Sequence, residues 1–230
     1  MKISNFVIFI LAIGLVTFSC KNNSKKAETT TTTAKSDSKP VESAVPPSNA
    51  SGKYSVDTKN STIHWTGKKV MGAHNGIIKL SKGVISVANG RIKGGAFEID
   101  MTSIEDKSIA DPSDKADLEN HLKSPDFFNA GEYPHAYFTI TKIEELEKNL
   151  QNITHKIYGD LQIKGIKKPV EFNASMAILD DKIALVTPSF TINRTDWGVN
   201  FHSGILGTVK DKIIEDNIGL VMDIKANKVQ

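Results

Sequence analysis

From residue 53 onward, apolar and polar side chains alternate with a period of two in one stretch after another. The apolar positions of the four clearest stretches are Ile63 and Trp65; Phe97, Ile99 and Met101; Val170, Phe172, Ala174, Met176 and Ile178; and Ile218, Leu220, Met222 and Ile224. Because alternate side chains of a strand point to opposite faces, each stretch predicts a strand with one apolar and one polar face. Such strands are typical of antiparallel sheets that have one face in water.

The pattern predicts strands at about 54–57, 61–70, 75–88, 91–102, 134–146, 154–165, 168–180, 182–193 and 215–227. Asn89-Gly90 and Asp180-Asp181 lie between such runs and indicate hairpins. No long amphipathic helix is available to cover the apolar faces, so the strands must cover one another in a sandwich or a closed barrel. A barrel of about eight strands has an interior just wide enough for side chains or one slender ligand. A core packed solid, without a cavity, is the alternative.

One segment, 113–140, interrupts this run of strands. Leu118 and Leu122 lie four residues apart and predict a short helix, which Pro125 ends because the residue before a proline is pushed out of the helical region. Two adjacent aromatic residues follow it, Phe127 and Phe128. In a chain that is otherwise made of strands, we expect this insert to be a lid, a plug or an end seal.

The first 20 residues have the composition of a bacterial signal peptide. Residues 6–18 are a nearly unbroken apolar run, too short to span a bilayer, which takes roughly 20 residues. Ser19, a small residue, and Cys20, the only cysteine, directly follow the run. This arrangement resembles the lipobox of bacterial lipoproteins, which implies cleavage before Cys20 and lipidation of its thiol. An ordinary signal peptide with an incidental cysteine and a retained anchor helix are the alternatives.

Residues 21–52 contain five consecutive threonines and almost no large apolar side chains, so we expect a disordered tether. Their five lysines and three acidic residues, together with Lys2, account for the whole net charge of +3. Residues 53–230 are therefore neutral. A neutral domain lacks the clustered basic face that nucleic acid requires, so we expect no nucleic-acid partner.

Five stretches of the domain carry a family resemblance, and they read YSVDTKNSTIHWTGKKVMGAHNG, GRIKGGAFEIDMTSIED, HLKSPDFFNAGEYPHAYFTI, YGDLQIKGIKKPVEF and SFTINRTDWGV. Together they make residues 53–230 similar to the YceI-like family of secreted bacterial proteins. The resemblance implies an all-β fold, an extended eight-stranded antiparallel lipocalin-like barrel with the short helix as an insert. It also implies that a polyisoprenoid chain, quinone-like or polyprenyl, is bound in the lumen. No catalytic residues and no cofactor come with it.

In such a barrel the ligand would touch inward-facing side chains, and the residues that we expect to bind it are Trp65, His74, Phe97, Phe138, Leu161, Phe172, Met176, Phe190, Leu220 and Met222. His74 lies at the family's His-x-Gly position. It is either a polar contact at the barrel mouth or part of a turn into a long strand. His64 is expected on the outer surface, and His121 either packs under the helix or meets a ligand head group.

A polar and aromatic cluster follows a predicted strand at 189–200. Arg194 and Asp196 form either a surface ion pair or a pair at the cavity mouth. Trp197 has an indole N–H that needs a partner, so it suits a rim with one wet side.

Motifs for chemistry are missing from the sequence: there is no HExxH, no Cys/His cluster and no GxSxG. We therefore expect neither a metal nor an enzyme. The hypothesis is a lipid carrier or reservoir of the cell envelope, anchored through Cys20. Lys21, next to that cysteine, favours the outer membrane, with the domain facing the periplasm or the cell surface. The alternative is a scaffold or stress-response protein with a filled core, and whether the chain forms a homodimer is left open.

Overall fold

The computed structural model describes residues 49–147, 152–204 and 210–230. Cys20 and nearly all of the predicted tether lie outside these residues, so the predictions made for them remain predictions. The described residues belong to one compact unit, Val45–Gln230. None of the helices found in them combines the length and the apolar character that crossing a membrane requires.

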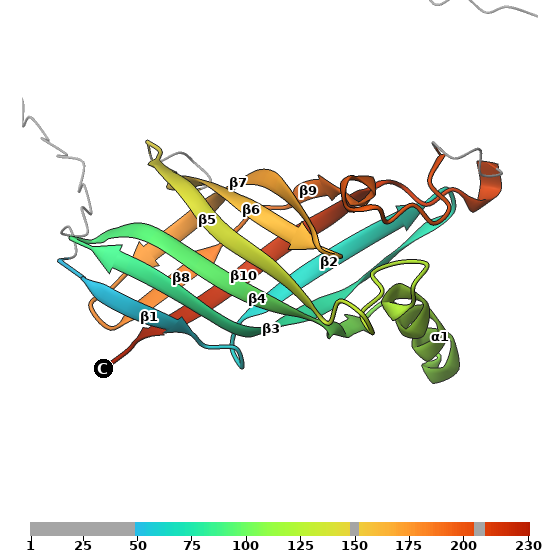
Figure 1. Cartoon of the computed structure of the whole chain (residues 1–230), viewed down its shortest axis with the longest axis horizontal. Helices are drawn as coiled ribbons and strands as arrows, with labels where there is room; N and C mark the ends of the chain where they lie inside the picture. The colour runs from blue at the N-terminus through green and yellow to red at the C-terminus, as the bar shows by residue number, and fades with distance from the viewer. Residues whose placement is uncertain (1–48, 148–151, 205–209) are drawn as a thin grey trace, which may run out of the picture. The chain divides into compact units, whose positions relative to one another are not determined.

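The described residues form strands, one short α-helix and two 3-10 turns (Figure 1). In chain order these are β1 (Gly52–Val56), β2 (Thr62–Lys69), β3 (Gly72–Ala88), β4 (Arg91–Asp106), α1 (Pro112–Lys123), β5 (His135–Glu145), β6 (His155–Ile163), β7 (Ile166–Ile178), β8 (Lys182–Val186), β9 (Phe190–Asn193), η1 (Arg194–Trp197), η3 (Lys210–Lys212) and β10 (Asn217–Lys228). The predicted all-β class is confirmed.

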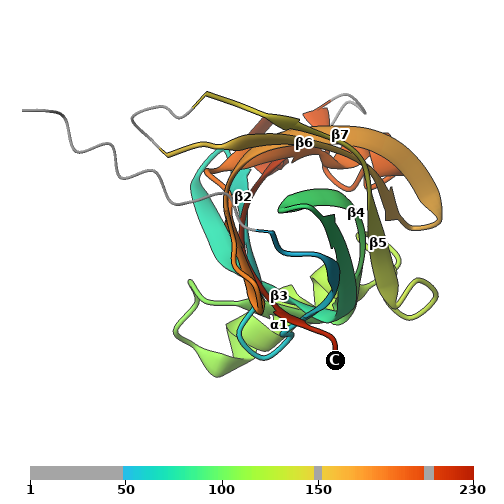
Figure 2. The ribbon, with the colours of Figure 1, turned by 90° about the vertical axis from the view of Figure 1, so that its left-hand side faces the viewer.

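The strands form a closed antiparallel ring, seen end-on in Figure 2. From β10 the order runs through β2, β3, β4, β5, β6, β7 and β8, and β8 pairs with β10 again. At two of the eight positions around the ring, a pair of short strands takes the place of one long strand. β1 and β2 pair with successive segments of both β3 and β10, and β8 and β9 pair with successive segments of β10. The strand that ends the chain therefore pairs with four others, β1, β2, β8 and β9.

Local signals in the sequence account for most of the turns. Asn89 and Gly90 both have positive φ angles, 53° and 71°, as a two-residue hairpin turn requires. The predicted single strand at 182–193 is wrong, because Pro188 lies between β8 and β9. A proline has no amide hydrogen to donate to a neighbouring strand, so the ladder stops there.

The helix α1 ends directly before Pro125, as the sequence predicts. The Asp111 side chain accepts hydrogen bonds from the backbone N–H groups of Ser113 (2.8 Å) and Asp114 (3.1 Å), and Ser124 follows the last turn, directly before Pro125. None of the residues in this helix is buried. The helix lies at one end of the strand ring (Figure 1), outside the buried core.

The opposite end of the ring is filled with side chains, and we call it the closed end. Tyr54, Ile85, Ala174, Ile183 and Ala226 are each at most 2% exposed there. The Tyr54 hydroxyl, on β1, donates to the carbonyl oxygens of Leu179 (3.2 Å) and Asp180 (2.9 Å). These two carbonyls belong to the connection between β7 and β8, so one side chain ties together segments that lie 125 residues apart in sequence.

Candidate functional site

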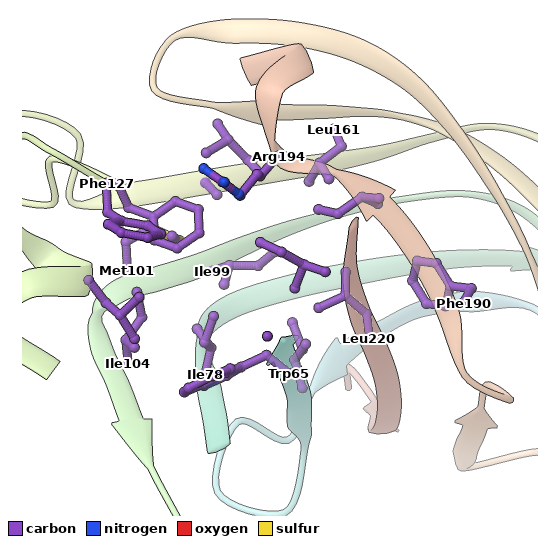
Figure 3. Close-up of a pocket in the computed structure, with 18 of the residues that line it drawn as sticks. Trp65, Ile78, Ile99, Met101, Ile104, Phe127, Leu161, Phe190, Arg194 and Leu220 are labelled. Atoms are coloured by element: carbon purple, nitrogen blue, oxygen red, sulfur yellow. The ribbon is translucent and has the colours of Figure 1, made fainter. Parts of the chain in front are cut away.

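A cavity of about 580 Å³ occupies the part of the ring interior that the closed end leaves free. Apolar side chains from neighbouring strands surround it, and Figure 3 shows Trp65, Ile78, Ile99 and Leu220 around one space. Among the described strands, only β1 contributes no residue to the lining. We call this cavity the tunnel, and its end beside α1 the mouth.

The tunnel brings together nine of the ten residues predicted to touch a ligand: Trp65, His74, Phe97, Phe138, Leu161, Phe172, Phe190, Leu220 and Met222. Met176 is not among the lining residues. It packs against the buried core, although its cross-strand partner Leu185 lines the tunnel. That the nine residues hold a ligand stays a prediction.

Glycines in the wall make room for the aromatic rings of the tunnel. Gly76 is the cross-strand partner of Trp65, and a Cβ at this glycine would lie 2.7 Å from the indole ring. A Cβ at Gly159 on β6 would lie 2.3 Å from the ring of Phe138 on β5. Each ring therefore occupies space that a side chain of the neighbouring strand would otherwise take. The rings lie against the wall, and the bore stays open.

Four phenylalanines form a continuous row across β4, β5, β7 and β9. The ring centroids are 6.0 Å apart for Phe97 and Phe138, 5.6 Å for Phe138 and Phe172, and 4.7 Å for Phe172 and Phe190, the last pair being stacked. The row gives one side of the tunnel a broad aromatic surface. Aromatic surface buries a large apolar area without demanding hydrogen bonds.

Aromatic side chains also gather at the mouth. The His121 ring of α1 contacts Phe127 and Phe201 edge-on, at centroid distances of 5.2 and 4.6 Å. His121 also lines the tunnel, and whether it meets a ligand head group stays a prediction. The helical insert predicted as a lid or end seal thus supplies part of the mouth. Phe201 was not predicted, because it lies outside the strands and no periodicity marks it.

Arg194 is buried beside the mouth, only 2% exposed. Its guanidinium donates to the carbonyl oxygens of Glu215, Val199 and Ile214 and to the Asp216 carboxylate, at 2.7 to 3.2 Å. Burial lowers the pKa of Arg194, and the charge of Asp216 opposes this effect. The predicted pair with Asp196 is wrong, because the turn η1 directs the guanidinium toward the segment before β10.

Trp197 also differs from its prediction. It is 2% exposed, and its indole N–H donates to the carbonyl oxygen of Leu161 at 3.0 Å. The expected wet side is therefore absent from this residue. The N–H finds its partner on β6, a strand that local sequence around Trp197 cannot reveal.

His74 lies at the mouth and lines the tunnel. Its Nδ1 is 3.2 Å from the Ser108 hydroxyl, and the buried Asp106 carboxylate accepts hydrogen bonds from the N–H groups of Ser108 (2.8 Å) and Ile109 (2.7 Å). His74 thus lies near the start of a long strand and borders the tunnel, and whether it contacts a ligand stays a prediction. His64 is exposed on the outside of the ring, as expected.

Charged side chains of the lining are confined to the mouth: Lys68, Lys69, Arg194, Asp211, Lys212 and Glu215. Within the described residues, no three His, Cys, Asp or Glu side chains gather where they could hold a metal ion. What the deeper lining can do is hold an apolar molecule by burying its surface.

Comparison with known proteins agrees with this architecture. A Staphylococcus aureus UPF0312 protein (strain MSSA476) is 36% identical over 93 residues, which are 38% of this chain and 49% of that protein. A UPF0312 protein of Photorhabdus laumondii is 36% identical over 61 residues, 26% of this chain and 29% of that protein. The chain thus spans about half or less of the length of these curated relatives.

Two solved structures share the fold. BcnA of Burkholderia cenocepacia superimposes with a TM-score of 0.58 at 19% identity, covering 74% of this chain and 98% of its own. A polyisoprenoid binding domain from Saccharophagus degradans, implicated in plant cell wall breakdown, gives 0.53 at 11% identity and covers 76% and 98%. The model of the YceI-like domain matches residues 54–226, which is nearly the whole strand ring. The chain therefore belongs to the YceI-like family.

Proposed function

We propose that this protein binds a long apolar isoprenoid-type lipid, quinone-like or polyprenyl, in the tunnel. The observation that carries the proposal is an apolar cavity of about 580 Å³ inside a closed ring of strands, with charged side chains only at its mouth. Pockets for small molecules span about 300–1,000 Å³, so the cavity has the size of a ligand site rather than of a packing defect. The alternative of a core packed solid does not account for it.

The comparisons support the same ligand class. The S. degradans domain is described as polyisoprenoid binding, and it shares the fold of this chain. The lining adds a reason from its chemistry, since below the mouth it offers aliphatic and aromatic side chains from nearly every strand. Such a wall selects by width and length rather than by hydrogen bonds.

Burial of the hydrocarbon would supply the affinity. Each CH₂ removed from water contributes about 0.8 kcal/mol, so a five-carbon isoprene unit contributes at most about 4 kcal/mol. Ordering a flexible chain inside the tunnel offsets a large part of this gain. The affinity therefore depends on how many units the tunnel encloses.

The proposed role is a non-catalytic carrier or reservoir in the cell envelope. Lipidation of Cys20 would hold the domain near the outer membrane, and at least two acyl chains make such an anchor stable. The tether 21–52 would then let the domain reach lipid without leaving that surface.

The test is mass spectrometry of an organic extract of the purified full-length protein. An isoprenoid lipid is expected to co-purify with it from several hosts, and the absence of any such lipid from all of them contradicts the proposal. A Met222→Trp variant should lose the lipid while still unfolding cooperatively, because the larger ring occupies tunnel space. Val221→Trp is the matched control, since Val221 neighbours Met222 on β10 but does not line the tunnel, and it should keep the lipid.

A further inference from the structure

We infer that the rim of the mouth docks on a bilayer of anionic lipid through the turn between β2 and β3. The inference goes beyond the proposed function, because it names a second surface and a second partner. It holds whether or not the tunnel carries a ligand. It starts from two apolar side chains that the fold leaves in water.

Val70 and Met71 form the two-residue turn of the β2–β3 hairpin. They are 57% and 83% exposed, and Met71 is the most exposed large apolar side chain among the described residues. Turns of this kind usually carry Gly, Asn or Asp, which suit both the backbone angles and the contact with water. Neither the turn nor the core therefore accounts for an adjacent valine and methionine, and apolar side chains that gather in water mark an interaction site.

The turn is held in place at the rim of the mouth. The Val70 N–H donates to the carbonyl oxygen of Ile213 at 3.4 Å, and the Glu215 N–H donates to the carbonyl oxygen of Lys68 at 2.8 Å. Figure 1 shows that the hairpin turns at the end of the ring opposite the C-terminus, beside the segment that leads into β10. Lys68 and Lys69 line the tunnel, so the two apolar side chains are presented on a fixed support at the edge of its mouth.

Lysines surround this turn. The paired segments 68–71 and 210–215 together carry four lysines and two acidic residues. All four lysines are exposed, and none of them forms an ion pair with another described residue: Lys68, Lys69, Lys210 and Lys212. Residues 111–123, which include α1, carry four acidic and two basic side chains instead. The positive charge of the rim is thus concentrated where the apolar turn lies.

An anionic bilayer fits this combination better than a protein does. Two adjacent apolar side chains are too small for a stable protein interface, which takes about 800 Å² from each partner. Sites that bind a membrane surface place apolar side chains at the boundary between head groups and acyl chains, and lysines around them attract anionic lipid. Docking in this way turns the mouth toward the bilayer. An anchor at Cys20 would bring the domain close to a membrane, but it would not select the end of the domain that enters it.

The experiment determines which end of the domain enters the bilayer. In the full-length chain with Cys20→Ser, which removes the only native thiol, Met71→Cys or Val229→Cys attaches one environment-sensitive fluorophore. Val229 is 52% exposed and bonded to Lys53 near the closed end, so it is the matched control. On phosphatidylglycerol vesicles the label at position 71 should shift to the blue and be quenched by spin-labelled lipid, whereas the label at position 229 should stay in water. An equal response of both labels, or no response at position 71, overturns the proposal.

Charge variants of the chain labelled at position 71 test the role of the lysines. Lys68→Gln with Lys69→Gln should raise the vesicle concentration needed for the response about tenfold or more, because lysines near an anionic surface add to the attraction. Lys53→Gln with Lys93→Gln removes the same charge from exposed positions near the closed end and should change that concentration less than about twofold. Equal losses in the two variants, or an undiminished response on neutral phosphatidylcholine vesicles, overturn docking on anionic lipid. A label at position 71 that no vesicle affects, yet that is shielded from a water-soluble quencher in intact cells, assigns the turn to a protein partner instead.

Discussion

The two ends of the strand ring are built from the same alternating pattern, yet one is filled and the other is hollow. At the closed end, Tyr54 reaches from β1 to the carbonyls of the β7–β8 connection, and branched aliphatic side chains fill what remains. In the hollow part, Trp65 and Phe138 lie over Gly76 and Gly159. Alternation thus specifies a ring with an apolar inside, and the sizes of cross-strand pairs decide whether that inside is full.

The sharpest test of this difference compares one substitution in both parts. Ile85→Ala removes a fully buried side chain from the closed end and should cost about 3–4 kcal/mol of unfolding free energy, because a new cavity forms. Ile99→Ala in the tunnel wall should cost about 1 kcal/mol, since its side chain already borders empty space. Urea unfolding of the lipid-free protein measures both. Equal costs would mean that the two parts are packed alike.

The hollow part depends on polar contacts at its mouth. Arg194→Met should lower the unfolding free energy by about 3 kcal/mol, because it leaves three carbonyl oxygens and Asp216 without their donor. Arg91→Met is the control for the same change at an exposed pair, where Arg91 meets Glu145 at 2.9 Å, and it should cost at most about 0.5 kcal/mol. Urea midpoints compare the two variants. Similar losses in the two variants would show that the buried guanidinium contributes no more to the unfolding free energy than an exposed ion pair does.

The contacts between the wall glycines and the aromatic rings can be tested one at a time. Gly159→Ala places a methyl group where the Phe138 ring lies and close to the carbonyl oxygen of Thr139, so it should cost about 1–3 kcal/mol and narrow the tunnel. Gly94→Ala is the matched control on β4, with no atom within 4 Å of the new methyl group, and should be nearly neutral. Thermal unfolding gives the stabilities. A Gly159→Ala protein as stable as Gly94→Ala contradicts the role given to the wall glycines.

The smallest expected effect concerns pH and His155, on β6 beside β5 and β7. Burial lowers its pKa below the ordinary 6.5, and Glu145 only partly opposes this. Below about pH 6.5 the unfolded chain binds a proton that the folded chain does not, so stability falls as the pH is lowered. His155→Gln should therefore flatten this part of the pH profile of the urea midpoint. An unchanged slope in His155→Gln would assign the pH effect to other groups.

Much of the fold could be predicted from the sequence, because its signals are local. Alternation marks the strands, Asn89-Gly90 marks a hairpin, and Pro125 marks the end of the helix. The one strand predicted across Pro188 is wrong, although the proline itself carries the signal. A local rule outweighed the longer apolar pattern at that position.

The site was harder to predict, because its decisive contacts join distant parts of the chain. Arg194 finds Asp216 rather than Asp196, and Trp197 finds a carbonyl on β6. That Trp65 lies over Gly76 depends on strand register, which alternation alone does not specify. Whether a lumen exists at all follows from the sum of such pairs, so the sequence alone left a filled core open.

The pairing of β10 with four other strands determines when the ring can close. β10 is made last, and it pairs with β1 and β2 from the start of the domain. Contacts between the two ends of a domain cost loop-closure entropy and form slowly. Without β10, Asn217–Lys228, the ring cannot close, and the strands that it pairs with keep unpaired edges and an exposed apolar face. The apolar faces of the earlier strands therefore need protection from aggregation until β10 is made, and the tunnel proposed to hold a lipid is enclosed only afterwards.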